Sequence, residues 1–333
     1  MTSDLLLKTE DSMFRPAWWL PNGHSQTLWR KVAGSRPVTH RRQRVELSDG
    51  DFIDLDWCDE VDVADSETIV LVVHGLCGCS ESSYVLALQS LLASCEVASV
   101  AMNLRGCSGE VNRKARTYHS GVSDDLAEVI AALHAQYENR NLMVVAYSLG
   151  ANVLLKWLGE SGRQSAVERA VAVSTPFTLR LCSQSLMSGF SRLYGRYFTR
   201  RLVSDLQKKI AHFERIGDGE QLEQLLALGD SSTINTVWEF DERVTAPLHG
   251  FSDAEDYYGQ CSSIGFLGAI ETPTLLIQSS DDPMIPPAAL PKGTQLSPAL
   301  EFELLGKGGH VGFVNAERNP WLEHRILRYV LAD

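Results

Sequence analysis

Short, continuous runs of hydrophobic residues recur along the chain and alternate with helix-length amphipathic segments. The hydrophobic runs lie at residues 69–73, 97–102, 142–146, 170–173, 274–278 and 300–304. The amphipathic segments lie near residues 82–94, 122–137, 149–158 and 319–331. Strands that are apolar throughout are buried on both faces, which is typical of a parallel sheet covered by crossover helices. The pattern therefore predicts an α/β fold with a mainly parallel sheet.

Alternating apolar residues precede the first buried run. They occupy residues 45–47 and 52–57, and the turn Ser48-Asp49-Gly50 separates the two segments. An Asp-Gly pair between two alternating segments is typical of an antiparallel β-hairpin. Residues 1–40 are mostly polar and irregular, with an aromatic cluster at residues 18–24. We expect them to form an arm that lies over the surface.

The strand and helix alternation is interrupted between residues 177 and 270. This segment contains two or three amphipathic helices and a polar stretch at residues 214–236. One helical segment combines an apolar stripe with a basic face. The stripe is formed by Phe190, Leu193, Tyr194, Tyr197 and Phe198. The basic face is formed by Arg192, Arg196 and Arg200. A solvated face is the default interpretation of the arginines, and contact with an anionic group is the alternative. We expect a helical lid, residues 177–270, inserted into a core of residues 41–176 and 271–333.

Charge and composition exclude several classes of protein. The 333 residues include 30 Lys and Arg against 42 Asp and Glu, which gives a formal net charge of −12 at pH 7. This balance argues against nucleic-acid binding and against electrostatic docking on an anionic membrane. No apolar stretch reaches the ~18 residues that span a bilayer, and the first residues lack a signal-peptide pattern. The 7 cysteines are an odd, scattered set, which indicates reduced thiols in the cytoplasm.

Ser148 is the candidate nucleophile. It follows the buried run at 142–146 and precedes a helical segment, with the small residues Ala146 and Gly150 on either side. This arrangement resembles the Gly-x-Ser-x-Gly elbow, in which a sharp turn between strand and helix exposes the serine hydroxyl. Ser263 also stands in a Ser-x-Gly triplet, but no apolar strand precedes it.

A serine hydroxyl needs a base, and the base needs an orienting carboxylate. Asp281 and Asp282 follow the run at 274–278, and carboxyl ends of parallel strands collect catalytic groups at one sheet edge. We prefer Asp282, which directly precedes Pro283, and Asp281 remains the alternative. His310 lies in the glycine-rich segment after the last strand and is the candidate base, whereas His324 lies within the terminal helix.

The oxyanion formed during attack requires backbone N–H donors that are already in place. The amide of Leu149 at the start of the helix is one candidate. The second would come from the glycine-flanked turn at residues 74–78, where Leu76 is preferred and Cys77 is the alternative. Cys77 and Cys79 form a close pair, but no further His or Cys stands at metal-binding spacing, so we expect no metal site there.

Five segments together resemble the YheT-like esterase family, relatives of the α/β-hydrolase-domain lipases. They are Pro21-Asn22-Gly23-His24-Ser25-Gln26-Thr27, His74-Gly75-Leu76-Cys77-Gly78, Ala146-Tyr147-Ser148-Leu149-Gly150-Ala151-Asn152, the stretch 249–258, and Gly308-Gly309-His310-Val311-Gly312-Phe313. The resemblance covers nearly the whole chain. It implies an α/β-hydrolase fold and a Ser-Asp-His carboxylic-ester hydrolase carried here by Ser148, Asp282 and His310.

The sequence thus predicts a serine esterase that forms an acyl-enzyme and uses no metal or organic cofactor. The expected substrate is a small ester or lipid-like molecule of short to medium acyl length. The same triad also serves thioesterases, amidases and acyltransferases. A different alternative is a catalytically silent scaffold that binds an apolar ligand under the lid.

Overall fold

Eight strands of the computed structural model, which describes residues 14–316 and 320–332, form one sheet in the order β1-β2-β4-β3-β5-β6-β7-β8. Their bounds are β1 His40–Glu46, β2 Phe52–Cys58, β3 Thr68–Val73, β4 Ala98–Asn103, β5 Asn141–Tyr147, β6 Arg169–Val173, β7 Thr274–Ser279 and β8 Leu300–Leu305. β1 and β2 form the predicted antiparallel hairpin, and β2 also pairs antiparallel with β4. The remaining pairs are parallel. The predicted fold class is confirmed.

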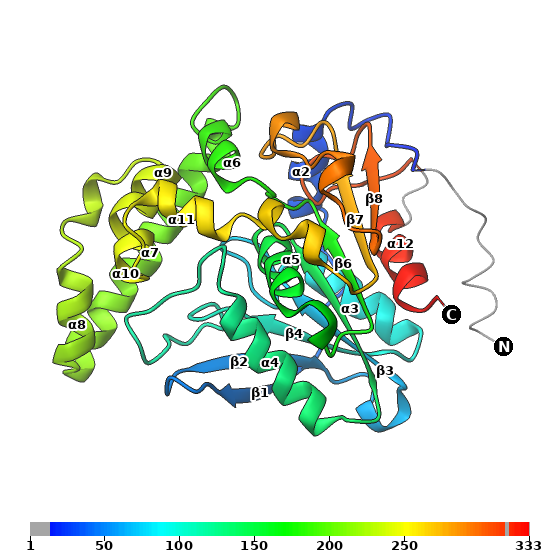
Figure 1. Cartoon of the computed structure of the whole chain (residues 1–333), viewed down its shortest axis with the longest axis horizontal. Coiled ribbons are helices and arrows are strands. Elements are labelled where there is room, and N and C mark those ends of the chain that lie inside the picture. The colour runs from blue at the N-terminus through cyan, green and yellow to red at the C-terminus, as the bar shows by residue number, and fades with distance from the viewer. Residues whose placement is uncertain (1–13, 317–319, 333) are drawn as a thin grey trace.

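Two layers of helices cover the sheet (Figure 1). α4 (Ser123–Gln136) and α5 (Leu149–Ser161) bury their apolar residues on one face, in a cluster that also contains the hairpin residue Trp57. α3 (Ser83–Ser94) and α12 (Trp321–Val330) cover the other face. Leu71 belongs to the first cluster and Val72 to the second, so a central strand is buried on both sides. This explains the continuous hydrophobic runs in the sequence.

Between β6 and β7 the chain forms a group of helices beside the sheet, on the left in Figure 1. They are α6 Leu179–Ser185, α7 Arg192–Ile216, α8 Gly219–Leu226, α9 Val237–Phe240, α10 Ala246–Leu248 and α11 Ala254–Cys261. A π-helical turn, Asp241–Thr245, joins α9 to α10. The apolar stripe of α7 is not uniformly covered, because Tyr194 is buried whereas Leu193 and Tyr197 are exposed.

The expectation of an irregular N-terminal arm is wrong for residues 23–32, which form helix α2 (Gly23–Val32). The side chain of Asn22 caps this helix by accepting the N–H of Ser25, and the hydroxyl of Ser25 accepts the N–H of Asn22 in return. Such reciprocal capping stabilises the start of a helix that contains few apolar residues. Residues 1–13 lie outside the described part of the chain.

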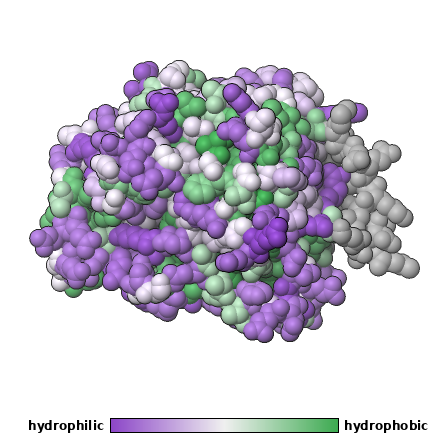
Figure 2. Space-filling view, in the orientation of Figure 1, coloured by the Kyte–Doolittle hydropathy of each residue, from purple (hydrophilic) through white to green (hydrophobic). Residues whose placement is uncertain are grey.

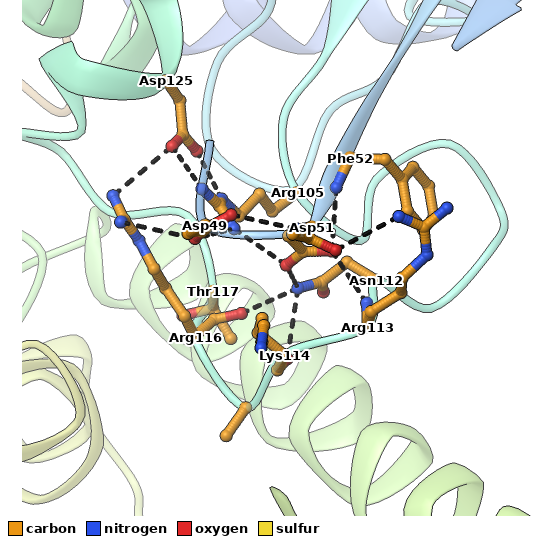
Figure 3. Close-up of polar contacts among 12 residues, drawn as sticks. Asp49, Asp51, Phe52, Arg105, Asn112, Arg113, Lys114, Arg116, Thr117 and Asp125 are labelled. Atoms are coloured by element: carbon orange, nitrogen blue, oxygen red, sulfur yellow. Dashed lines mark hydrogen bonds and ion pairs between the residues drawn. The ribbon is translucent and has the colours of Figure 1, made fainter. Parts of the chain in front are cut away.

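A buried polar network ties the hairpin to the loop after β4 (Figure 3). The guanidinium of Arg105 donates to Asp125 at the start of α4, at 2.7 Å to each oxygen, and to Asp51 at 2.8 Å. Asp51 also accepts from the side chain of Asn112 at 2.5 Å. Because each buried charge has a charged or polar partner, the loop of residues 105–118 is held firmly against the core.

Hydrophilic residues dominate the face of the molecule in Figure 2, and hydrophobic ones show in separate areas between them. Within the described ranges, none of the helices combines the length and the apolar character that crossing a membrane requires.

Candidate active site

Ser148 stands in a strained turn between β5 and α5. Its φ of 52° is positive, which is uncommon for a non-glycine residue, and its N–H donates to the carbonyl of Val173 on the neighbouring strand at 2.8 Å. A Cβ at Gly150 would come within 2.4 Å of the carbonyl oxygen of His74. A glycine two residues after the serine is therefore required by the close packing of this turn between strand and helix.

The structure brings Ser148, His310 and Asp282 together from three separate loops at the carboxyl edge of the sheet. Nε2 of His310 lies 2.8 Å from Oγ of Ser148, and Nδ1 lies 2.8 Å from Oδ2 of Asp282. Oδ1 of Asp282 accepts the N–H groups of Met284 and Ile285 at 2.8 and 3.2 Å. The carboxylate is therefore fixed by its own loop and can hold the imidazole toward the serine.

Asp281 has a different position. Its Oδ1 accepts the N–H of Gly309 at 2.9 Å, and a Cβ at Gly23 would lie 1.9 Å from its backbone oxygen. Asp281 thus joins the loop after β7 to the histidine loop and to α2. Its side chain contacts the residue before His310 rather than the imidazole itself.

The loop after β3 lies directly against the serine. A Cβ at Gly75 would meet the Cβ of Ser148 at 2.9 Å, so only glycine permits this approach. Within residues 14–316 and 320–332, no hydrogen-bond acceptor takes the N–H of Leu76 or of Leu149. The N–H of Cys77, by contrast, donates to the hydroxyl of Tyr118 at 3.0 Å. Of the two candidates in this turn, Leu76 has the available donor.

Two further histidines, His74 and His324, lie in different surroundings from His310. His74 is buried in the turn at residues 74–78, with Nδ1 2.8 Å from the carbonyl of Gly75 and Nε2 accepting from the N–H of Leu104 at 3.1 Å. Burial lowers the pKa of His74 to about 4. Its ring is neutral and both nitrogens are used. His324 lies on α12, under the opposite face of the sheet from α5.

Helix α2 supports the histidine loop, a role that the sequence analysis missed. The hydroxyl of Thr27 accepts the N–H of His310 at 2.8 Å and donates to the carbonyl of Gly23 at 2.7 Å. The side chain of Gln26, fully buried, bonds both backbone groups of Val314. His24 lies 3.2 Å from the hydroxyl of Tyr194 on α7. The motif at residues 21–27 was visible in the sequence, but only the structure shows which loop it contacts.

A cavity of about 80 Å³ opens above the serine. Ser148 and His310 lie at its base, and Met284 and Ile285 form the wall beside the histidine. The segment between β6 and β7 supplies further wall residues, among them Leu179, Leu186, Phe198, Asp241 and Tyr258. The cavity is mainly apolar, with a few polar groups near the serine, as is typical of a small-molecule site.

The thiols and acids of the described residues do not indicate a metal site. Across these residues, no three His, Cys, Asp or Glu side chains are grouped as metal ligands. Burial raises the pKa of the Cys77 thiol to about 12, and the pKa of Cys79 is also raised by burial. These cysteines are therefore protonated at neutral pH, which does not suit a nucleophile.

Comparison with known proteins places the chain among the α/β hydrolases. Residues 68–317 match the family described as alpha/beta hydrolase fold. YheT of Escherichia coli, named as a candidate esterase, is 36% identical over 329 residues, covering 98% of this chain and 95% of that protein. The human phospholipase ABHD3 is 29% identical over 309 residues, covering 90% of this chain and 73% of that protein.

Solved structures agree on the fold. The esterase Pf2001 of Pyrococcus furiosus superimposes with a TM-score of 0.55 at 15% identity, covering 88% of this chain and 92% of that one. The esterase RhEst1 of Rhodococcus gives a TM-score of 0.51 at 20% identity, covering 88% and 98% of the two chains.

Proposed function

The chain belongs to the α/β-hydrolase family, in its YheT-like branch of esterase-like proteins, and we propose that it hydrolyses carboxylic esters through Ser148, His310 and Asp282. One observation carries the proposal. The hydroxyl, the imidazole and the carboxylate form a continuous hydrogen-bonded chain, with 2.8 Å at both contacts of His310, at the base of a mainly apolar cavity.

The geometry supports a two-step reaction. His310 Nε2 takes the proton of Ser148 as Oγ bonds to the ester carbonyl carbon, and Asp282 stabilises the resulting imidazolium. The imidazolium then gives the proton to the alcohol oxygen as the carbon–oxygen bond breaks, which leaves an acyl-serine. A water molecule, deprotonated by His310 in the same way, releases the acid and restores Ser148.

The N–H groups of Leu76 and Leu149 hold the oxyanion in this proposal. Both are free of acceptors in the described part of the chain, and Gly75 places the first of them against the serine. Donors fixed in advance stabilise the developing charge without reorganisation, which is usually a large contribution to catalysis.

We propose that residues 177–270 act as a lid on a core of residues 41–176 and 271–333. Leu186 and Phe198 of this segment line the cavity above Ser148. The buried side chain of Asn152 on α5 donates to the carbonyl of Cys261 and accepts from the N–H of Ser263, which fixes the end of the segment to the core. The relatives named as a phospholipase and as a monoacylglycerol lipase favour a small ester or lipid-like substrate.

Turnover of p-nitrophenyl butyrate by matched alanine variants tests the function. Ser148→Ala and His310→Ala should each lower kcat by roughly 10³-fold or more. Ser263→Ala is the control, because Ser263 stands in the other Ser-x-Gly triplet and outside the cavity, and it should retain activity. Absence of any esterase activity in the wild-type protein would instead support a silent scaffold.

A further inference from the structure

A second cavity, of about 120 Å³, adjoins the one above the triad. The two share five wall residues, namely Leu76, Ser120, Leu149, Val237 and Asp241. The larger cavity is lined by neither Ser148 nor His310. It extends from the two proposed oxyanion residues to α7 and the π-helical turn, and the triad chemistry described above does not use it.

The stereochemistry of ester cleavage assigns different directions to the two halves of the substrate. The leaving alcohol oxygen must lie near Nε2 of His310 to receive its proton. The carbonyl oxygen must face the N–H groups of Leu76 and Leu149. With Oγ of Ser148 as the third substituent of the tetrahedral carbon, the acyl chain takes the remaining direction, away from the imidazole. The larger cavity lies on that side, because its walls include both oxyanion residues and exclude His310.

The walls of the larger cavity suit an alkyl chain. Much of the lining is aliphatic or aromatic, contributed mainly by the lid segment: Leu202, Leu206, Val237, Phe240 and Val244. Burying each methylene of a chain against such walls favours binding by about fourfold.

Three charged residues in the same walls, Arg105, Lys209 and Asp241, already have partners. Lys209 donates to the carbonyl oxygens of Lys114 and Arg116 at 2.8 Å each. Asp241 accepts from the hydroxyls of Thr245 and Tyr258 at 2.8 and 2.7 Å, and Arg105 is held by the acidic residues of Figure 3. Since these groups are satisfied within the protein, an alkyl chain can cover them without breaking a hydrogen bond.

We infer that the larger cavity is the acyl-chain site and that the cavity above Ser148, whose walls include Met284, holds the leaving alcohol. This inference rests on the proposed function. The volume of the larger cavity limits the length of the acyl chain. An apolar cavity of about 150 Å³ accommodates benzene, with six carbons, so 120 Å³ takes about five carbons beyond the carbonyl. The substrate class is therefore an ester of a medium-chain fatty acid, close to hexanoate.

Paired substitutions in the two cavities test the assignment. For p-nitrophenyl esters, kcat/KM of the wild type should rise by about fourfold per methylene from acetate to hexanoate and then fall. Leu202→Phe fills only the larger cavity and should lower the hexanoate-to-acetate ratio of kcat/KM by at least about tenfold, and Leu202→Ala should move the best substrate to a longer ester.

Met284→Phe is the matched control, since Met284 is also half-buried and lines only the chamber beside His310. Met284→Phe should leave the hexanoate-to-acetate ratio of kcat/KM unchanged. It should alter the ratio of kcat/KM between ethyl acetate and hexyl acetate. If Met284→Phe changed the acyl ratio while both Leu202 variants kept the wild-type ratio, the assignment would be overturned, although the esterase function would stand. A wild-type protein that hydrolyses no ester would overturn both.

Discussion

At the scale of single residues, the two adjacent aspartates after β7 have separate tasks. Asp282 bonds the imidazole of His310, whereas Asp281 bonds the backbone of Gly309. We predict that Asp282→Asn lowers kcat for p-nitrophenyl butyrate by about 10³- to 10⁴-fold, because an amide cannot stabilise the imidazolium and favours the wrong tautomer.

Asp281→Asn is the matched control for this substitution. Its amide oxygen can still accept the N–H of Gly309, so kcat should fall less than about tenfold. An Asp281→Asn variant as impaired as Asp282→Asn would show that the acid has been assigned to the wrong residue.

Ser148 and His310 could be predicted from the sequence because each lies in a local sequence pattern that their proposed roles require. The elbow needs a buried strand, a small residue on each side of the serine and a helix, and the 142–152 segment supplies all of them. The choice between Asp281 and Asp282 depends on side-chain direction at the end of β7. The sequence favoured Asp282, and the structure supplies the hydrogen bond that distinguishes the two.

At the scale of elements, α2 holds the loop that carries His310 from a distant part of the chain. Thr27 holds the N–H of His310, so Thr27→Val leaves that donor without an acceptor while keeping the side-chain shape. We predict that kcat falls about tenfold with little change in KM, because the loop shifts but the substrate cavity does not. Steady-state kinetics with p-nitrophenyl butyrate provides the measurement.

The conservative variant Thr27→Ser separates positioning from folding. It restores the hydroxyl and should return kcat to near the wild-type value. If Thr27→Ser and Thr27→Val lowered kcat equally, α2 would have no positioning role. The same would follow if both substitutions lowered only the fraction of folded protein.

The sequence missed this element because α2 has few apolar residues, and Leu28, Trp29 and Val32 among them are exposed rather than buried. Its burial relies on polar side chains, notably Gln26, that bond a loop nearly 290 residues later. By contrast, the six hydrophobic runs correctly predicted strands β3 to β8, and the alternating segments predicted the hairpin strands β1 and β2. The amphipathic segments predicted the four helices that cover the sheet, since burial on a sheet requires apolar side chains in a regular pattern. The lengths and number of the helices between β6 and β7 could not be predicted, because their packing partners are mostly one another.

At the scale of the whole molecule, buried neutral histidines connect stability to pH. Burial lowers the pKa of His74 to about 4, whereas the unfolded chain binds that proton near pH 6.5. Between these values the unfolded state holds more protons, so the free energy of unfolding decreases as the pH falls through this window. His74 accounts for about 3 kcal/mol of this decrease in the free energy of unfolding, and the decrease is complete only below pH 4.

His74→Gln removes the ionisable group but keeps a donor and an acceptor. Between pH 7 and pH 4 this variant should lose about 3 kcal/mol less unfolding free energy than the wild type, as measured by urea denaturation. His134→Gln, on the exposed side of α4, should follow the wild-type pH dependence. Parallel curves for His74→Gln and wild type would show that His74 contributes no pH dependence.

The central claim is that Ser148 is a nucleophile activated by His310 and Asp282. The most direct measurement is intact-protein and peptide mass spectrometry after reaction with p-nitrophenyl hexylphosphonate, in which Oγ bonds to phosphorus and nitrophenol leaves. We predict one hexylphosphonyl group per wild-type chain, located on the peptide that contains Ser148, and none on Ser148→Ala. An unmodified wild-type protein, or equal modification of Ser148→Ala, would contradict the account.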